Sequence, residues 1–88
     1  MRKIVVLNAD EITALDQQNP STAGDGGFQR FIVGLQQKLR RGTSELILTD
    51  DDQEAIAHHA FDIGQGGFQT RLVKIFGRTL GPQLGRES

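Results

Sequence analysis

A six-residue motif occurs twice in this chain of 88 residues. Residues 24–29 read Gly-Asp-Gly-Gly-Phe-Gln, and residues 64–69, forty positions later, read Gly-Gln-Gly-Gly-Phe-Gln. The match extends further, because a mainly aliphatic run at 4–7 corresponds to another at 45–48. A solenoid or propeller needs at least three copies of its repeat. Two copies therefore predict one domain built from two pseudo-symmetric units.

Each repeat is predicted to contain one strand followed by two helices. The β-branched and aliphatic residues favour strands over 3–7 and 45–48. Each strand is followed by a residue that favours a helix N-cap and, three positions later, by an acid that can return a hydrogen bond to the cap. These two capping pairs are Asn8 with Glu11 and Thr49 with Asp52. They predict helices over about residues 9–18 and 50–62. A loop is predicted at 19–26, because Pro20 biases Asn19 away from helical angles.

The second helix of each repeat is predicted from its apolar spacing. From Phe28 onward, apolar residues recur at i, i+3, i+4, i+7 and i+11, which is typical of a one-faced amphipathic helix over about 27–41. Arg40 and Arg41 would then lie at its negative end, before a stop at Gly42. The equivalent helix is predicted over about 67–80.

The expected fold is a mostly helical α+β domain, in which a short two-stranded ribbon packs on four helices. Residues 1–81 form the domain, with repeats at 3–42 and 45–81, and residues 82–88 are predicted to be a flexible tail. A two-stranded sheet is marginal by itself. Two arrangements stay open, because the strands can pair within one chain or across the twofold axis of a homodimer.

Composition places the chain among small globular proteins. Hydrophobic residues make up 36% of the chain, and it has no cysteine, which excludes disulfides and thiolate chemistry. No apolar run approaches the roughly 18–20 residues of a membrane span. The apolar run near the N-terminus is also too short for a signal peptide. We therefore expect a cytoplasmic protein that does not enter a membrane.

Charge alternates in step with the repeat, although the net charge is only −1. Residues 8–25 and 44–62 contain acids without bases, whereas 26–42 and 67–78 contain bases without acids. One interpretation is charge pairing inside the molecule, between acidic first helices and basic second helices. The other is a basic stripe that binds phosphate. We favour the first interpretation.

Two groups of residues are candidates for binding. The glycines before the second helices can supply turns, and the free N–H groups of a helix N-terminus can hold an anion. These turn and anion-binding candidates are Gly26, Gly27, Gly66 and Gly67. The second group combines exposed charges with a glutamine retained in both repeats, and it is predicted to contact a partner. It comprises Asp50, Asp51, Asp52, Arg40, Arg41, Gln69, Arg71, Lys74 and Arg78.

The sequence does not predict an enzyme, a cofactor or a metal site. The consecutive acids Asp50–Asp52 do not share one helix face, and they suit the positive end of the helix dipole. His59 falls on an apolar stripe and is expected to be partly buried. His58 shares an exposed face with Glu54 and Asp62, which is interpreted as a solvated polar face. No nucleophile and base can be paired from the sequence.

The second glycine motif and its flanks carry a resemblance. Residues 60–72 and 75–81 resemble small uncharacterised proteins from phages and prophages of proteobacteria, with a helix, a Gly-x-Gly-Gly-aromatic-Gln turn and a helix. Small phage proteins without catalytic residues are often inhibitors of host machinery, including anti-CRISPR proteins. By this class analogy the chain is expected to inhibit a host protein complex, such as a defence nuclease. A DNA-binding regulator and a protein that sequesters nucleotide signals stay open as alternatives.

Overall fold

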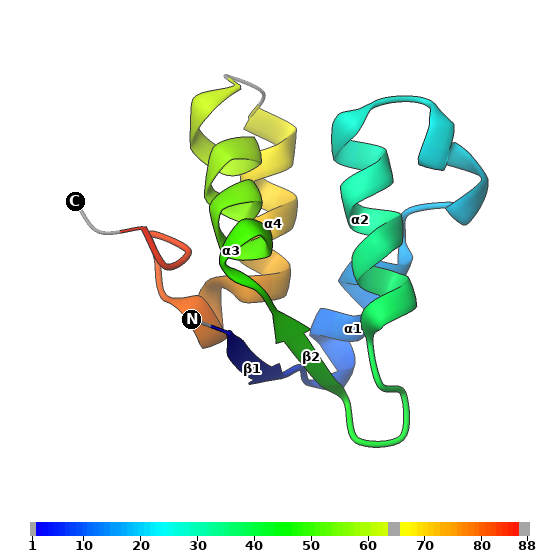
Figure 1. Cartoon of the computed structure of the whole chain (residues 1–88), viewed down its shortest axis with the longest axis vertical. Coiled ribbons are helices and arrows are strands. Elements are labelled where there is room, and N and C mark those ends of the chain that lie inside the picture. Colours follow the sequence, from blue (N-terminus) through cyan, green and yellow to red (C-terminus); the bar gives the residue numbers. More distant parts are fainter. Residues whose placement is uncertain (1, 64–65, 87–88) are drawn as a thin grey trace.

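The computed structural model describes residues 2–63 and 66–86 and forms a mostly helical α+β fold (Figure 1). Its Cα radius of gyration is 11.9 Å, close to the roughly 12 Å expected for a compact chain of this length. These residues contain two strands, four α-helices, a 3₁₀ helix and a π-helical turn. In chain order they are β1 (Lys3–Val6), α1 (Ala9–Asp16), η1 (Pro20–Gly24), α2 (Gly27–Lys38), β2 (Glu45–Leu48), α3 (Asp50–Ala57), η2 (His58–Asp62) and α4 (Gly66–Leu80).

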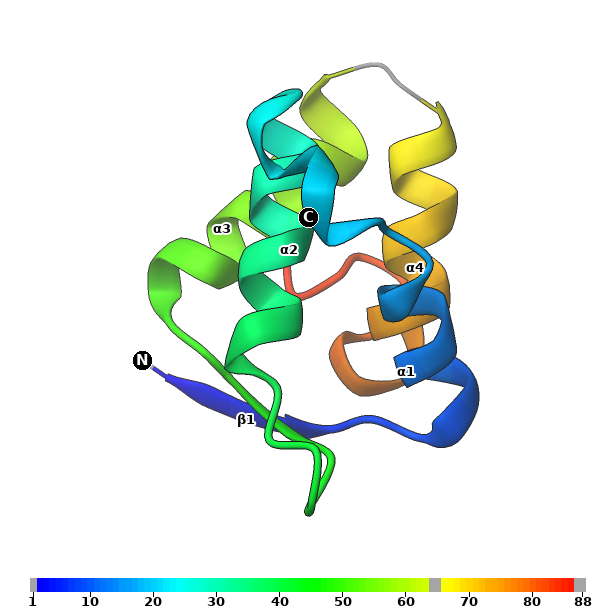
Figure 2. The same cartoon turned by 90° about the vertical axis from the view of Figure 1, so that its right-hand side faces the viewer.

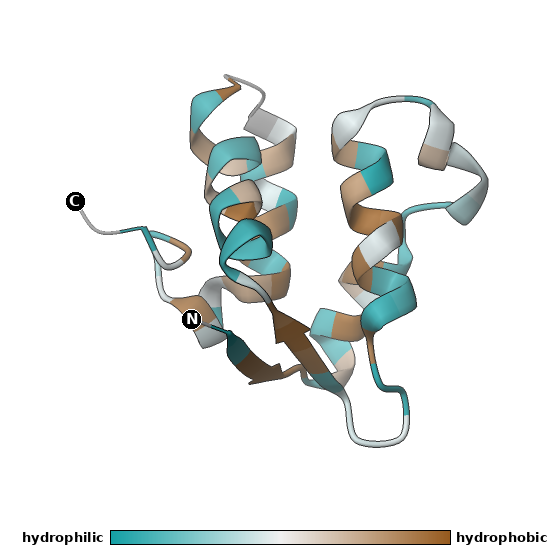
Figure 3. Cartoon of the chain, viewed as in Figure 1, coloured by the Kyte–Doolittle hydropathy of each residue, from teal (hydrophilic) through white to brown (hydrophobic). Residues whose placement is uncertain are grey.

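The two strands pair within the chain as an antiparallel ribbon, so the open question of strand pairing is answered for this structure. The register places Val5 opposite Leu46, and both side chains are buried. Those two residues occupy the same position of the sequence repeat, so the strands cross at a local twofold axis. Both strands are apolar along most of their length (Figure 3). Ile4 and Val6 point to the outer face, where 60% and 54% of them is exposed.

The opposite end of the domain repeats this symmetry. Phe28 of α2 and Phe68 of α4 are equivalent residues, and their rings stack with centroids 3.9 Å apart. The two glycine-rich helix starts therefore meet through their aromatic residues. Figure 2 shows the starts of α2 and α4 at the end of the domain that lies away from the ribbon. One pseudo-twofold relation thus links a strand pair and a ring pair that are far apart in the sequence.

Two salt bridges fasten the repeats to each other at equivalent positions. Glu11 of α1 binds Arg78 of α4, and Asp52 of α3 binds Lys38 of α2. In each case the capping acid of one repeat meets a base on the second helix of the other. We call these four residues the crosswise clasp. The predicted charge pairing within the molecule is therefore confirmed for these helices.

Both predicted capping boxes are present. The Asn8 side chain accepts from the Glu11 N–H at 2.8 Å, while the Glu11 carboxylate accepts from the Asn8 N–H at 2.8 Å. Thr49 and Asp52 make the same pair of bonds at 3.1 and 3.0 Å, although aspartate is shorter than the usual glutamate. These bonds satisfy backbone donors that a helix start leaves free. They also fix each acid where the clasp needs it.

A single apolar core lies between the ribbon and the helices. Its fully buried side chains come from both repeats, and their largest members are Phe76, Leu15, Ile32, Leu35, Leu46, Leu48, Ile56, Leu72, Ile75 and Leu84. Burial of a leucine or phenylalanine contributes about 1.5–3 kcal/mol each. Hydrophobic burial therefore outweighs the individual surface ion pairs in holding the repeats together.

Three predictions need correction. The helix predicted over 27–41 ends at Lys38, so Arg40 and Arg41 lie in the linker that follows it. Arg40 pairs instead with Glu45 through an isolated bridge, which turns the chain toward β2. The loop predicted at 19–26 contains a 3₁₀ helix, because Pro20 occupies its first turn and Asn19 caps it.

The third prediction that needs correction is the flexible tail at residues 82–88. Leu84 is fully buried in the core, and Arg86 forms a salt bridge with Asp62. Residues 82–86 are therefore an ordered part of the domain, whereas residues 87–88 lie outside the described residues. Leu84 has a φ of 52° and Ser44, its equivalent in the first repeat, has a φ of 60°. The same left-handed turn thus follows the second helix of each repeat.

Candidate functional site

Four predicted partner-binding residues are engaged inside the molecule. Asp52 and Arg78 belong to the crosswise clasp, and Arg78 also donates to the carbonyl of Val6 at 2.7 Å. Arg41 donates to both carboxylate oxygens of Asp16, at 2.7 and 3.0 Å. The fourth residue, Arg71 of the second repeat, donates a hydrogen bond to Gln18 of the first repeat. These contacts give the four side chains a structural role.

Arg71 takes part in a second crosswise contact near the pseudo-twofold axis. Its guanidinium donates to the Gln18 side chain at 2.8 Å and lies 5.1 Å from the centre of the Phe28 ring. The equivalent pair in the other half is His59 with Phe31, whose rings stack at 5.5 Å. Polar and aromatic pairs therefore fill the same place in the two repeats.

His59 is half-buried among aromatic rings, as the sequence predicted. Its Nδ1 is buried and has no hydrogen-bond partner within residues 2–63 and 66–86, and the ring centroids of Phe28 and Phe68 lie 5.5 and 6.4 Å from that of His59. Burial lowers the pKa of His59, and the neighbouring His58 lowers it further. The neutral ring is therefore favoured at the place where the repeats meet.

The clasp carboxylates are stabilised in their charged form. Burial alone raises the pKa of Glu11, but hydrogen bonds from Arg78 and from the Asn8 backbone, with the Arg78 charge, lower it overall. The pKa of Asp52 is lowered in the same way, because burial is outweighed by bonds from Lys38 and Thr49. Both acids are therefore ionised partners of a base at neutral pH.

The remaining predicted residues are distributed over several elements. Arg40, Gln69 and Lys74 are exposed in the linker and on α4, and no ion pair or hydrogen bond among the described residues joins any two of them. Gly26 precedes α2 and Gly27 begins it, while Gly66 and Gly67 open α4. The anion-binding role of these glycines stays a prediction. Part of the second turn, residues 64–65, lies outside the described residues.

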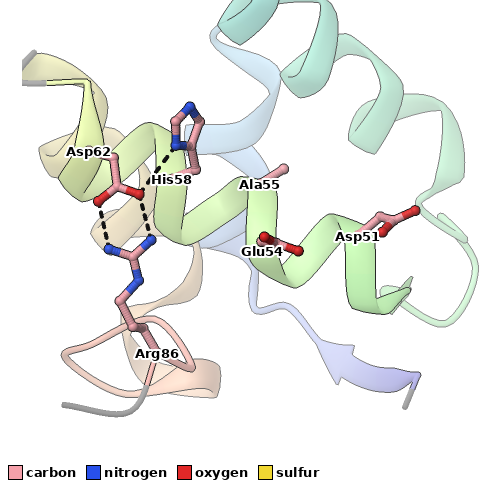
Figure 4. Close-up of a pocket in the computed structure, with 6 residues that line it drawn as sticks. All are labelled: Asp51, Glu54, Ala55, His58, Asp62 and Arg86. Atoms are coloured by element: carbon pink, nitrogen blue, oxygen red, sulfur yellow. Dashed lines mark hydrogen bonds and ion pairs between the residues drawn. The ribbon is translucent and has the colours of Figure 1, made fainter.

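Asp51 is the predicted residue that leads to a concave site. It lines an open cleft of about 300 Å³ that runs along α3 and η2 and is closed on one side by the C-terminal segment (Figure 4). The lining residues are Asp51, Glu54, Ala55, His58, Asp62 and Arg86. A smaller hollow of about 210 Å³ shares Glu54 and Arg86 with this cleft. We call the larger hollow the α3 cleft.

One wall of the α3 cleft is a charged pair. Arg86 donates to both oxygens of Asp62 at 2.7 Å, in the bidentate geometry that suits a guanidinium and a carboxylate. The His58 Nδ1 lies 3.2 Å from the same carboxylate (Figure 4). Hydrogen bonds from Arg86 and His58, together with their charges, lower the pKa of Asp62 well below its ordinary value. Arg86 also lies 5.7 Å from the centre of the Phe61 ring.

The rest of the α3 cleft is acidic. Asp51 and Glu54 are exposed, and the structure records no salt bridge for either among residues 2–63 and 66–86. Asp51 differs in this respect from its neighbour Asp52, whose carboxylate is held by the clasp. The π-helical turn that carries His58 and Asp62 is a rare element found frequently at functional sites. The cleft can therefore accept a cationic group.

Sequence reasoning placed Glu54, His58 and Asp62 on one exposed face, and the structure confirms that placement. It missed the cleft, because the opposing wall comes from Arg86 in the segment predicted to be a tail. The spacing of four residues between the three side chains was the available signal. That spacing does not indicate where Arg86, 24 positions away from Asp62, lies in the fold.

Within the described part of the chain, no group of three or more metal-ligating side chains is close enough to hold a metal ion. The helices described there are also too short or too polar to cross a bilayer. Comparison with protein-family models, with curated proteins and with solved structures gave no match to this chain.

Proposed function

We propose that the protein acts by binding a basic segment of another protein in the α3 cleft, and that it thereby inhibits a host macromolecular complex. The observation that carries this proposal is the pair of exposed carboxylates, Asp51 and Glu54, that line an open hollow and form no salt bridge within residues 2–63 and 66–86. Carboxylates gathered on one hollow surface add their potentials, and the summed potential attracts a cation from solution.

The charge of the cleft selects a cation. Asp51, Glu54 and Asp62 contribute three negative charges and Arg86 contributes one positive charge, so these four side chains sum to a charge of −2. An arginine or lysine side chain of the partner compensates this charge. Ala55 leaves room for its apolar stem, which long basic side chains bury while they keep the charged end on polar groups.

Arg86 illustrates how such a ligand binds. Its guanidinium already docks against this surface by two hydrogen bonds to Asp62 and a contact with the Phe61 ring. A second guanidinium beside it would find Asp51 and Glu54. Bidentate arginine–carboxylate contacts are directional as well as strong, which suits recognition of one segment over another.

The proposed class of partner rests on the resemblance to phage and prophage proteins. Such a protein gains its effect by occupying a surface that a host complex needs, and a basic surface is what a nucleic-acid-binding complex exposes. A defence nuclease has such a surface. Carboxylates in the cleft would then compete with phosphate for the same basic residues.

The test is a capture experiment with matched variants. Tagged protein is incubated with nuclease-treated lysate of the host, and the bound proteins are identified, purified and assayed for inhibition. Asp51→Lys with Glu54→Lys is expected to lose the partner and the inhibition. Asp10→Lys is the matched control, because Asp10 is the repeat equivalent of Asp51, is exposed, and forms no salt bridge with another described residue. It is expected to keep both activities.

Two outcomes contradict the proposal. One is capture and inhibition that the double variant retains at the wild-type level. The other is capture of nucleic acid alone before nuclease treatment, with a steep loss of binding in salt, which would favour the DNA-binding regulator.

A further inference from the structure

We propose that two copies of this chain form a twofold dimer by exchanging their second repeats. We call the contacts between a first and a second repeat the crosswise interface. In such a dimer the first repeat of each chain packs against the second repeat of the other. This inference is independent of the proposed function, because it does not involve the α3 cleft.

The observation behind it is that the contacts between the repeats are self-complementary. Val5 meets its equivalent Leu46, and Phe28 meets its equivalent Phe68. The clasp salt bridges, Glu11 with Arg78 and Asp52 with Lys38, are also exchanged by the pseudo-twofold. This is the organisation of an interface between two identical subunits, here joined into one chain.

The linker between the repeats is built so that it can open. Arg41 is anchored on the first repeat by Asp16, and the carbonyl of Ser44 accepts from the Leu7 N–H of β1. Gly42 and Thr43 between them are exposed. The closing turn rests on the Arg40 carbonyl, which accepts from Thr43 at 3.3 Å and Ser44 at 2.7 Å. In Figure 1 this segment is the loop that projects beyond the ribbon, between α2 and β2.

The closed chain and the exchanged dimer contain the same contacts outside this turn. Their relative stability is therefore set by the conformation of the linker and by the loss of freedom when two chains associate. Opening the turn also releases Ser44 from a left-handed φ of 60°, which is uncommon for a residue with a side chain. The exchanged dimer is expected to gain population as protein concentration rises.

Simple edge-to-edge pairing of two ribbons is a weaker explanation of a dimer. The Leu7 N–H donates to the Ser44 carbonyl, on the side of β1 that faces β2. Backbone N–H and C=O groups point to alternate sides of a strand from one residue to the next, so those of Ile4 and Val6 face the free edge of β1. The Arg78 guanidinium already donates to the carbonyl of Val6. The free edge is therefore partly occupied, whereas the crosswise interface is complete.

The test uses the absence of cysteine in the natural chain. Ile4 and Ile47 are directly opposite, and the alternation makes them a non-hydrogen-bonded pair. Such pairs have Cα atoms about 4.5 Å apart, which a disulfide tolerates. Ile4→Cys with Ile47→Cys is expected to form its disulfide within the chain when the linker is natural and the protein dilute.

Gly42→Pro with Thr43→Pro is then added to the cysteine pair. Proline at 43 removes one donor of the closing turn, and two prolines favour an extended linker. The expected result is a particle of twice the 9.7 kDa mass of one chain, whose disulfides join the two chains. The control is the cysteine pair with the natural Gly42 and Thr43 and with four Gly or Ser residues inserted after Gly42. This longer linker should give a monomer.

Two results of this variant overturn the proposal. One is a folded monomer, and the other is a dimer whose disulfides stay within each chain. If the variant does not fold, chains carrying only Ile4→Cys are mixed with chains carrying only Ile47→Cys, each with its natural linker. Exchange predicts a mixed disulfide between the two chains whose yield rises with concentration before oxidation. The yield from random collision is measured with chains that carry the exposed Gln37→Cys in place of Ile47→Cys. A mixed-disulfide yield no higher than this background would also overturn the proposal.

Discussion

The two salt bridges of the crosswise clasp occupy equivalent positions but differ in burial. Only 7% of the Glu11 side chain is exposed, and it accepts two hydrogen bonds from Arg78. Asp52 is 19% exposed and its partner Lys38 is 37% exposed. A carboxylate removed from water depends more on its partner than one that water still reaches. The repeat thus preserved the sign and place of each charge, while burial sets its energetic weight.

The ends of the two repeats differ more strongly. The left-handed turn after α2 leads through Ser44 into β2, whereas the equivalent turn after α4 inserts Leu84 into the core. The second repeat therefore uses the end of the chain to cover apolar surface and to build the α3 cleft through Arg86. The symmetric contacts hold the fold together, and the asymmetric segment creates the candidate site.

The stacked rings of Phe28 and Phe68 are expected to give the largest difference in the free energy of unfolding between equivalent substitutions in the two repeats. Phe28→Ala should lower the free energy of unfolding by about 3–5 kcal/mol, because Phe28 is 3% exposed and leaves a cavity. Phe68→Ala should cost less than half as much, since Phe68 is half-buried. Urea unfolding followed by circular dichroism measures both values. Equal losses would show that the stack is equally buried from both sides.

Truncation of Leu84 is the next largest effect. Leu84→Ala should lower the free energy of unfolding by about 2–4 kcal/mol, because the side chain is fully buried in the core. The neighbouring exposed residue gives the control, and Gln83→Ala should change stability by no more than about 0.5 kcal/mol. A change in Leu84→Ala as small as in the control would mean that the C-terminal turn does not cover the core in solution.

The clasp comparison is sharpened by neutralising each acid in turn. Glu11→Gln should lower the free energy of unfolding by about 1–3 kcal/mol at pH 7, and Asp52→Asn by about 1 kcal/mol or less. The folded pKa of Glu11 lies below its ordinary value of 4.5, so its contribution is present above that pH and is lost as the pH falls further. The gap between wild type and Glu11→Gln should therefore narrow below about pH 4.5. A gap that widens in acid would contradict this assignment.

The smallest effect concerns His59 and its repeat equivalent, Gln18. Because the folded pKa of His59 is lowered from 6.5, the unfolded chain takes up the proton first as the pH falls below that value. Stability should therefore decline from pH 6.5 downward, by a few tenths of a kcal/mol to about 1 kcal/mol. His59→Gln should remove this decline, and the exposed His58→Gln should keep most of it, because burial is the larger cause of the lowered pKa of His59. Stability curves of wild type and His59→Gln that run parallel from pH 7 to 5 would exclude His59 as the source.

Much of this fold was predictable from the sequence because its signals are local. The strand at 45–48, both capping boxes and the amphipathic faces depend on residues within one or two turns of each other. Alternation of charge with the repeat also predicted pairing inside the molecule. It could not tell which base meets which acid, because that depends on how the repeats pack.

The failures share one cause, which is packing between distant segments. Arg41 resembles a residue at a helix end, but its salt bridge with Asp16 holds it in the linker. The polar composition after Pro82 is typical of a tail, yet one leucine in it finds a place in the core. Asp51 was identified from exposed charge, whereas the cleft around it required the position of Arg86. Sequence patterns indicate which residues are exposed but not which exposed residues converge.

The most direct test of the crosswise arrangement is a nuclear Overhauser experiment on the wild-type protein with labelled phenylalanine, valine and leucine. The crosswise arrangement predicts contacts between the rings of Phe28 and Phe68 and between Val5 and Leu46, in the same folded species. Phe68 contacts confined to its own repeat, or a Val5 that contacts no residue of the second repeat, would contradict the pseudo-twofold clasp on which this account rests.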